Sequence, residues 1–431
     1  MVRIRRAYQN RFFYGITSVF TMDRRTFLRT SAGVTGGVAL AGCAGLFSVT
    51  QGEPPLVENR PAAVYYPTHT EGMEMVGMSG MGETDMNMNG SGAMGGMNDS
   101  SAMAMNGSGE TSANDSSGTA TNSSGGMSMN GSASGGSEAS NYAFGLMYSY
   151  PHRFWTVNGD ETQKVSIEQE DAIHLMASVW EPKTRTVLPD TGLSVEITQD
   201  SDLVSQEAIY PMLSQAMGFH YGANFGLEGE GTYTVTLSVG GMSTRRTGAF
   251  VGMFSAPASV AIEFEYSQQA KEAIPYNRTE ERAGNRTADE PTNMGMVPNS
   301  IMPKRGKLPG EIVGTKSSGD GQFVLTVLNE PPKGIDARSQ YLAISARTPY
   351  NRMVLPAMAL SGTLQRDGQA VFDGALKPTL DPELKYHYGT VVDSIESGDE
   401  LQISIETPPQ VARHEGYETA FLDMSPMIFT M

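Results

Sequence analysis

Short runs in which apolar and polar residues alternate recur in two blocks of the chain, residues 141–268 and 305–431. An apolar residue at every second position is typical of a strand that buries one face of a sheet. Gly, Pro, Asn and Asp separate the runs, and neither block carries a sustained helical stripe. The pattern predicts an all-β protein with two antiparallel β-sandwiches. The clearest runs are Gly231–Val239, Ala258–Tyr266, Gln322–Leu328 and Glu400–Glu406.

A different composition fills the chain ahead of the first block. Residues 43–140 begin with several prolines and then consist largely of Gly, Ser, Asn, Met, Ala and Thr. Such a segment has too few branched or aromatic side chains to bury a core, so it predicts a disordered stalk. Twelve of the 28 methionines lie between Met73 and Met129, which favours loose capture of Cu(I) over drift in low-complexity sequence. Residues 269–304 are a second polar stretch and predict a linker between the sandwiches.

Residues 1–42 have the features of an export signal. The pair Arg24–Arg25, followed by Phe and Leu, fits the twin-arginine pattern, and Ser31–Ala41 is too short to span a bilayer. Leu40–Cys43 resembles the lipobox of bacterial and archaeal lipoproteins, in which the cysteine is acylated. We therefore expect lipidation at Cys43 and a mature chain held at the outer face of the cell membrane. Such an exported stalk offers six candidate glycosylation sequons, at Asn89, Asn98, Asn106, Asn114, Asn122 and Asn130.

The net charge and the cysteine content limit which partners and which kinds of site the protein can have. The net charge of −17 argues against nucleic acid as a partner. It suits cations, and together with twin-arginine export it resembles the proteins of halophilic archaea. Cys43 is the only cysteine, so the mature chain has no disulfide, and thiolate zinc sites, blue-copper centres and cysteine catalysis are excluded.

The two blocks also repeat a series of features in the same order. His220–Gly222 has a counterpart in His387–Gly389, and an alternating run follows each triplet. Arg245–Gly248 then corresponds to Arg413–Gly416. The ordered series predicts a diverged tandem duplication.

Histidine and methionine supply the candidate metal donors. His174 and Met176 fall at alternate positions of an apolar run, so both should project from the same face. Met212 precedes His220 by eight residues, a spacing that a tight bend can close. Imidazole suits copper, iron and zinc, and thioether sulfur selects Cu(I). The alternative is that these are core methionines and surface histidines.

The run Pro211–Asn224 resembles the periplasmic iron-transport accessory proteins encoded beside high-affinity iron permeases. The resemblance covers residues 141–268 and implies an immunoglobulin-like β-sandwich, usually dimeric, with a copper site and a second metal site nearby. In that family the ligands are a His within His-x-Glu, a Met after Pro, the His of His-Tyr-Gly-Ala-Asn and a later His. Carried over in order, the first three positions are His174, Met212 and His220.

Two departures change what the resemblance implies. Met176 stands where the family has Glu, which favours Cu(I) over iron, and the last His of the family falls near Arg246. In the second block Tyr341 replaces the first His, whereas His387 and His414 retain the other two positions. The full candidate set is therefore His174, Met176, Met212, His220, His387 and His414. If the family pairs as dimers, a tandem duplication predicts an intramolecular pseudo-dimer in which donors from both blocks meet.

These observations predict an extracytoplasmic, lipid-anchored protein that captures copper, iron or both for transport or homeostasis, serving an iron or copper permease. We expect binding and not catalysis, because no nucleophile motif, phosphate loop or paired-carboxylate signature is present. The small number of donors disfavours a copper redox enzyme. The alternative is a non-catalytic cell-surface structural or adhesion protein, with immunoglobulin-like domains on a glycosylated stalk.

Overall fold

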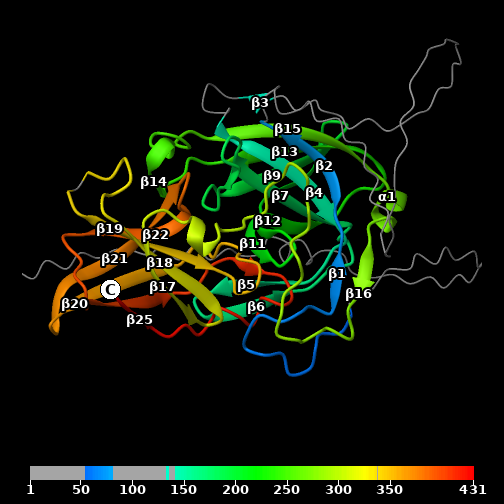
Figure 1. Cartoon of the computed structure of the whole chain (residues 1–431). Helices are drawn as coiled ribbons and strands as arrows, with labels where there is room; N and C mark the ends of the chain where they lie inside the picture. The colour runs from blue at the N-terminus through cyan, green and yellow to red at the C-terminus, as the bar shows by residue number, and fades with distance from the viewer. Residues whose placement is uncertain (1–53, 81–132, 135–140, 337) are drawn as a thin grey trace, which may run out of the picture. The chain divides into compact units, whose positions relative to one another are not determined.

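The computed structural model describes residues 54–80, 133–134, 141–336 and 338–431 (Figure 1). The predicted signal, Cys43 and the six sequons lie outside these residues. Within them the prediction of an all-β protein is confirmed, because strands dominate and helical structure is limited to three short segments. No helix among the described residues has the length and apolar character to cross a membrane. The helical segments are η3 (Gly248–Phe250), α1 (Gln268–Glu272) and η4 (Arg305–Lys307).

The first block is a sandwich of two sheets whose apolar faces meet. Tyr148 packs against both Phe264 and Tyr266 of the opposite sheet, with ring centroids 5.9 and 6.2 Å apart. The smaller sheet has the order β10 (Asp202–Ala208), β9 (Leu193–Gln199), β13 (Gly231–Val239), β15 (Ala258–Tyr266) and β3 (Ala133–Ser134). The larger sheet has the order β2 (Glu74–Ser79), β4 (Ala143–Ser149), β7 (Ile173–Glu181), β12 (Gly218–Phe225), β11 (Tyr210–Ser214), β24 (Ala412–Arg413), β5 (Phe154–Asn158) and β6 (Glu161–Val165). A short strand, β8 (Thr186–Val187), pairs with β7.

Alternation along the strands follows burial, as the sequence predicts. In β13 the apolar side chains are buried while the threonines and serine between them are partly exposed. All residues of β7 and β12 are buried, so the centre of the larger sheet is covered on both faces. A polar residue on the second face of β7, such as His174, is therefore sealed from water.

The second block is built around one long strand, β21 (Gln369–Asp381). Its first part pairs with β20 (Ala359–Arg366), and its last five residues pair with β22 (Lys385–Val392). The sheet has the order β17 (Glu311–Ser318), β18 (Gly321–Leu328), β19 (Gln340–Arg347), β22 (Lys385–Val392), β21 (Gln369–Asp381), β20 (Ala359–Arg366), β23 (Glu400–Thr407) and β25 (Met427–Thr430).

Each block contributes a short strand to the sheet of the other. From the second block, β24 lies parallel to β11, with Ala412 opposite Met212. From the first block, β14 (Arg245–Arg246) lies parallel to β21, with Arg245 opposite Thr379. Apolar residues of both blocks accordingly belong to one continuous core.

Residues 54–71, which we call the strap, are folded although the composition of the region predicts a disordered stalk. Val64, Tyr65 and Tyr66 are buried, and β1 (His69–Glu71) pairs with β16 (Tyr276–Arg278) inside the predicted linker. β2 then joins the larger sheet. The average composition of residues 43–140 does not reveal this aromatic cluster, which has enough apolar surface to pack against the folded blocks.

Buried hydrogen bonds hold the strap to the second block. The main-chain N–H of Tyr65 donates to the carbonyl oxygen of Gly416 at 3.1 Å. Glu418, only 2% exposed, accepts from the hydroxyl of Tyr65 at 2.5 Å and from Arg60 at 2.7 Å. The main-chain N–H of Thr68 donates to Glu415 at 2.9 Å. The strap therefore lies across the region where the two blocks meet.

Glu418→Ala should lower the free energy of unfolding by about 3 kcal/mol, because it leaves a buried hydroxyl and a guanidinium without their acceptor. Urea denaturation followed by circular dichroism measures the change. Glu396→Ala is the matched control, since Glu396 is 63% exposed in its ion pair with Arg366 and should barely move the midpoint. Equal midpoints for the two variants would contradict this account of the strap.

Candidate metal centre

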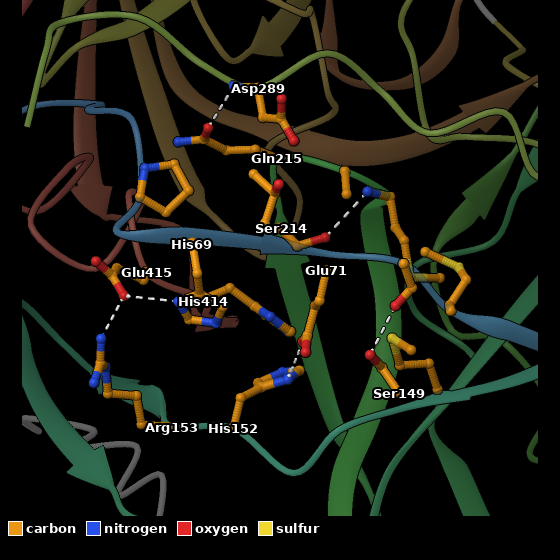
Figure 2. Close-up of a pocket in the computed structure, with 17 residues that line it drawn as sticks. His69, Glu71, Ser149, His152, Arg153, Ser214, Gln215, Asp289, His414 and Glu415 are labelled. Carbon is orange, nitrogen blue, oxygen red and sulfur yellow. Dashed lines mark hydrogen bonds and ion pairs between the residues drawn. The ribbon is translucent and has the colours of Figure 1, made fainter. Parts of the chain in front are cut away.

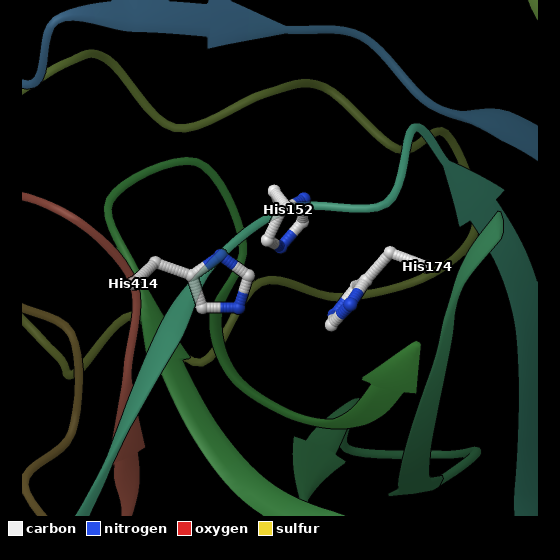
Figure 3. Close-up of side chains that lie close together, drawn as sticks. All are labelled: His152, His174 and His414. Carbon is white, nitrogen blue, oxygen red and sulfur yellow. The ribbon is translucent and has the colours of Figure 1, made fainter. Parts of the chain in front are cut away.

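Three histidines from distant parts of the chain converge beside β7 (Figure 3). His174 lies on β7, His152 in the loop between β4 and β5, and His414 directly after β24. Their ligand nitrogens all lie within 4.8 Å of one another. The ring centroid of His152 is 3.9 Å from that of His174 and 4.6 Å from that of His414. A group of imidazoles this close is an arrangement that one metal ion can bridge.

His220 and Met212 complete the group from the next two strands. The ring of His220 is 5.1 Å from that of His414, and His220 pairs directly with Met212 across β12 and β11. Both side chains are fully buried. A Cβ at Gly222 would lie 2.8 Å from the Nε2 of His174 and 3.1 Å from the Sδ of Met212. Glycine here leaves the space that the thioether and the imidazole border together.

Hydrogen bonds fix which ring nitrogen faces the centre. The Nδ1 of His220 donates to the carbonyl oxygen of Gly218 at 3.0 Å, and the Nδ1 of His174 to the Oδ1 of Asn224 at 2.7 Å. The amide of Asn224 donates in turn to a main-chain carbonyl, which sets its orientation. An Nδ1–H held in this way leaves the lone pair on Nε2, the pattern of metal-binding histidines.

Glu71 of the strap orients the third ring. The Nδ1 of His152 lies 2.5 Å from the Oε1 of Glu71 and 3.1 Å from the carbonyl oxygen of Tyr150, so this nitrogen carries the proton. Burial raises the pKa of Glu71 to about 7. On the other side of the pocket, Arg153 pairs with Glu415 at 2.6 Å.

The Nε2 atoms of His152, His174, His220 and His414 are buried and have no hydrogen-bond partner among the described residues. A buried polar atom without a partner costs about 1–3 kcal/mol, and here four such atoms lie in one place. Burial is also the main cause that lowers their pKa values, to about 3 for His152 and about 4 for His220, and well below the usual value for the other two. The rings are therefore neutral at physiological pH, which metal binding requires.

A pocket opens on one side of this group (Figure 2). His152 and His414 form part of its wall, and Figure 2 shows Glu71 directed at His152 within it. The thioethers of Met73, Met176 and Met217 also line it. Residues of the strap, from Pro67 to Glu71, form another part of the wall, so the pocket lies between the strap and the strands of the first block.

The candidate donors are distributed as follows. His174, Met212, His220 and His414 come together, so a histidine of the second block joins donors of the first. Met176 is opposite Gly222 in the sheet and forms part of the pocket wall. His387 lies in the second block, apart from this group. Its Nδ1 donates to a carbonyl oxygen, and its Nε2 is 3.0 Å from the hydroxyl of Tyr341.

Sequence reasoning did not assign His152 to the site, and it did not relate Glu71 to the histidines. His152 is an isolated histidine in a loop after Pro151, with no spacing to another donor that marks it. Glu71 belongs to a segment that was predicted to be disordered. The only available signal was the small number of histidines, six in 431 residues, which makes each of them a candidate.

The fold and the centre together define an all-β protein with a buried multi-histidine group where two strand-exchanged blocks meet. The chain belongs to a family described as a domain of unknown function (DUF7350), whose model matches residues 146–255 and 306–430, more than half of the chain. Comparison with curated proteins finds no match.

Two solved structures are weakly similar to part of the chain. One is FetP of uropathogenic E. coli, expressed in the periplasm of E. coli. It is 18% identical, with a TM-score of 0.22 over 29% of this chain and 88% of FetP. The other is a copper-bound variant of FetP, also 18% identical, with a TM-score of 0.21 over 29% of this chain and 89% of the variant.

In the metal-free protein we expect His152 and His220 to remain neutral at pH 5.5, where an ordinary histidine with a pKa of about 6.5 is mostly protonated. The unfolded chain takes up protons below pH 6.5 that the folded chain does not accept. The contribution of the buried neutral rings to the free energy of unfolding is therefore complete above about pH 6.5 and is lost as pH falls toward 4. Nitrogen-15 NMR should show neutral rings protonated on Nδ1. Cationic rings at pH 5.5 would contradict the burial.

Proposed function

We propose that this protein binds one copper ion, as Cu(I), at the group formed by His152, His174, His220, His414 and Met212. The observation that carries the proposal is the set of four buried Nε2 atoms without partners. A coordinated metal ion uses these lone pairs and removes the cost of leaving them unpaired. Bonds from Nδ1 to Asn224, Gly218 and Glu71 hold three of the rings in the tautomer that a metal needs.

The chemistry of the donors favours copper. Imidazole binds several divalent metals, but a buried thioether at Met212 selects soft Cu(I), and iron prefers oxygen donors. The carboxylate of Glu71 accepts the Nδ1–H of His152, which places it behind a donor and not among the donors. Copper is the cargo in this proposal, and the chain stores and transfers it without catalysing a reaction.

We propose that copper enters through the pocket beneath the strap. His152 and His414 belong both to the pocket wall and to the centre. Met73, Met176 and Met217 present thioether sulfur along the same wall, which suits Cu(I) on its way to the histidines. This assigns Met176 to the route and not to the final ligand set.

The place of action that we propose is the outer face of the cell membrane. The twin-arginine pattern and the lipobox-like Leu40–Cys43 support export and anchoring through Cys43. The resemblance of Pro211–Asn224 to accessory proteins of iron permeases supports delivery of the metal to a membrane permease. Copper bound by the purified protein would favour this function over a structural or adhesive role.

Cu(I) titration against a chromogenic chelator tests the site. The wild-type chain should bind one equivalent tightly, and His220→Ala should weaken this binding by at least about 100-fold, since a donor is worth several kcal/mol. His387→Ala is the matched control. His387 has the same His-Tyr-Gly context and the same burial, and it should retain the full equivalent. Unchanged binding by His220→Ala, or no preference for Cu(I) over Fe(II), would overturn the proposal.

Gly222→Ala tests the space between the donors. Its methyl group would meet the Nε2 of His174 at 2.8 Å and the Sδ of Met212 at 3.1 Å. Copper affinity should fall by about 10-fold or more, while circular dichroism keeps the β-sheet signal. Gly306→Ala serves as the control, because a Cβ there meets nothing within 4 Å. A Gly222 variant with wild-type affinity would show that the metal lies elsewhere.

A further inference from the structure

The second block repeats the pairing of the metal centre position for position. His387 lies opposite Thr379, as His220 lies opposite Met212. The Nδ1 of each histidine donates to the carbonyl oxygen two residues earlier, at 3.0 Å in both cases. The two imidazoles are therefore held in the same tautomer by the same local bond.

The first histidine of the centre has a counterpart as well. His174 pairs with Asn224, four residues beyond His220, and Tyr341 pairs with Val391, four residues beyond His387. Tyr341 therefore takes the place of His174. We call these three buried residues of the second block, Tyr341, Thr379 and His387, the counterpart centre.

The two exchanged strands, β24 and β14, bring different residues to the two centres. At the copper centre, Ala412 of β24 lies opposite Met212. At the counterpart centre, Arg245 of β14 lies opposite Thr379. The pairing thus matches Arg245 with Ala412, one residue away from the match with Arg413 that the sequence predicts, and it brings a methyl group to one centre and a cation to the other.

The guanidinium of Arg245 bonds to the acceptors of the counterpart centre. Its Nε donates to the hydroxyl of Thr379 at 2.9 Å. Its Nη2 donates to the hydroxyl of Tyr341 and to the carbonyl oxygen of Gly389, both at 2.8 Å. Gly389 is the counterpart of Gly222, so the guanidinium reaches the part of the sheet where the copper centre keeps its open space.

At the counterpart centre, both ring nitrogens of His387 have hydrogen-bond partners. The Nδ1–H of His387 goes to a carbonyl oxygen, so its Nε2 accepts the hydroxyl proton of Tyr341 at 3.0 Å. That hydroxyl accepts from Arg245 in turn. His220, by contrast, has a buried Nε2 with no partner among the described residues.

We propose that Arg245 takes the place of a metal ion in the second block and keeps that block from binding one. Its fixed positive charge repels an incoming cation, and its donors occupy the acceptors that a metal would need. The chain then carries a single metal centre. This inference rests on the proposed function for its description of the first centre.

Cu(I) titration of the full chain tests the role of Arg245. Tyr341→His with Thr379→Met restores the donor types of the first centre and retains Arg245. This double variant should still bind one equivalent. Adding Arg245→Ala should raise uptake to two equivalents, and His387→Ala in that background should return it to one. Circular dichroism and thermal unfolding confirm that each variant is folded.

A second equivalent bound by the double variant would overturn the proposal, as would a folded triple variant that binds only one. The wild-type chain gives an independent measurement by nitrogen-15 NMR of its histidines. On saturation with Cu(I), the Nε2 signal of His220 should shift and that of His387 should not, and a shift of His387 overturns the role of Arg245. Failure of the proposed function appears separately, as an unshifted His220.

Discussion

The parallel pairing of β24 with β11 is the contact on which the centre depends. Only two residue pairs define it, Met212 with Ala412 and Leu213 with Arg413. It nevertheless sets the path of the residues that follow β24. The N–H of His414 donates to the carbonyl oxygen of Leu213 at 3.1 Å, which places its ring beside His220. Arg413 is fully buried and donates to main-chain carbonyl oxygens on both sides of it in the sequence, those of Pro409, Tyr417 and Ala420. The histidine that the second block contributes to the group is therefore held in place by main-chain pairing.

Most of the fold was predicted by the periodic features of the sequence. Alternation in Gly231–Val239 and Ala258–Tyr266 predicted strands that pair along their full length as β13 and β15. The same local reasoning placed His174 on a strand and linked Met212 to His220. Features that depend on docking were not accessible in this way. The strap was hidden by the average composition around it, and His152 and Glu71 have no spacing that relates them to the other donors.

His220 and His387 show a further limit of local reasoning. The two residues share the triplet His-Tyr-Gly, complete burial and the same bond from Nδ1. Their surroundings differ because of residues far away in the sequence, Tyr341 and Arg245 in one case and His174 and His414 in the other. The triplet alone does not distinguish a buried lone pair without a partner among the described residues from one that accepts a hydroxyl proton.

The covalent link between the blocks has a consequence for symmetry. In a dimer of identical chains every substitution appears twice, so two equivalent sites must change together. Two blocks in one chain are free of this constraint, and here Arg245 lies beside one set of residues while the other set is made of histidines. A group assembled within one chain also has an effective concentration that dilution does not change. A protein built in this way keeps its histidine group assembled at any abundance, and the two blocks are free to differ.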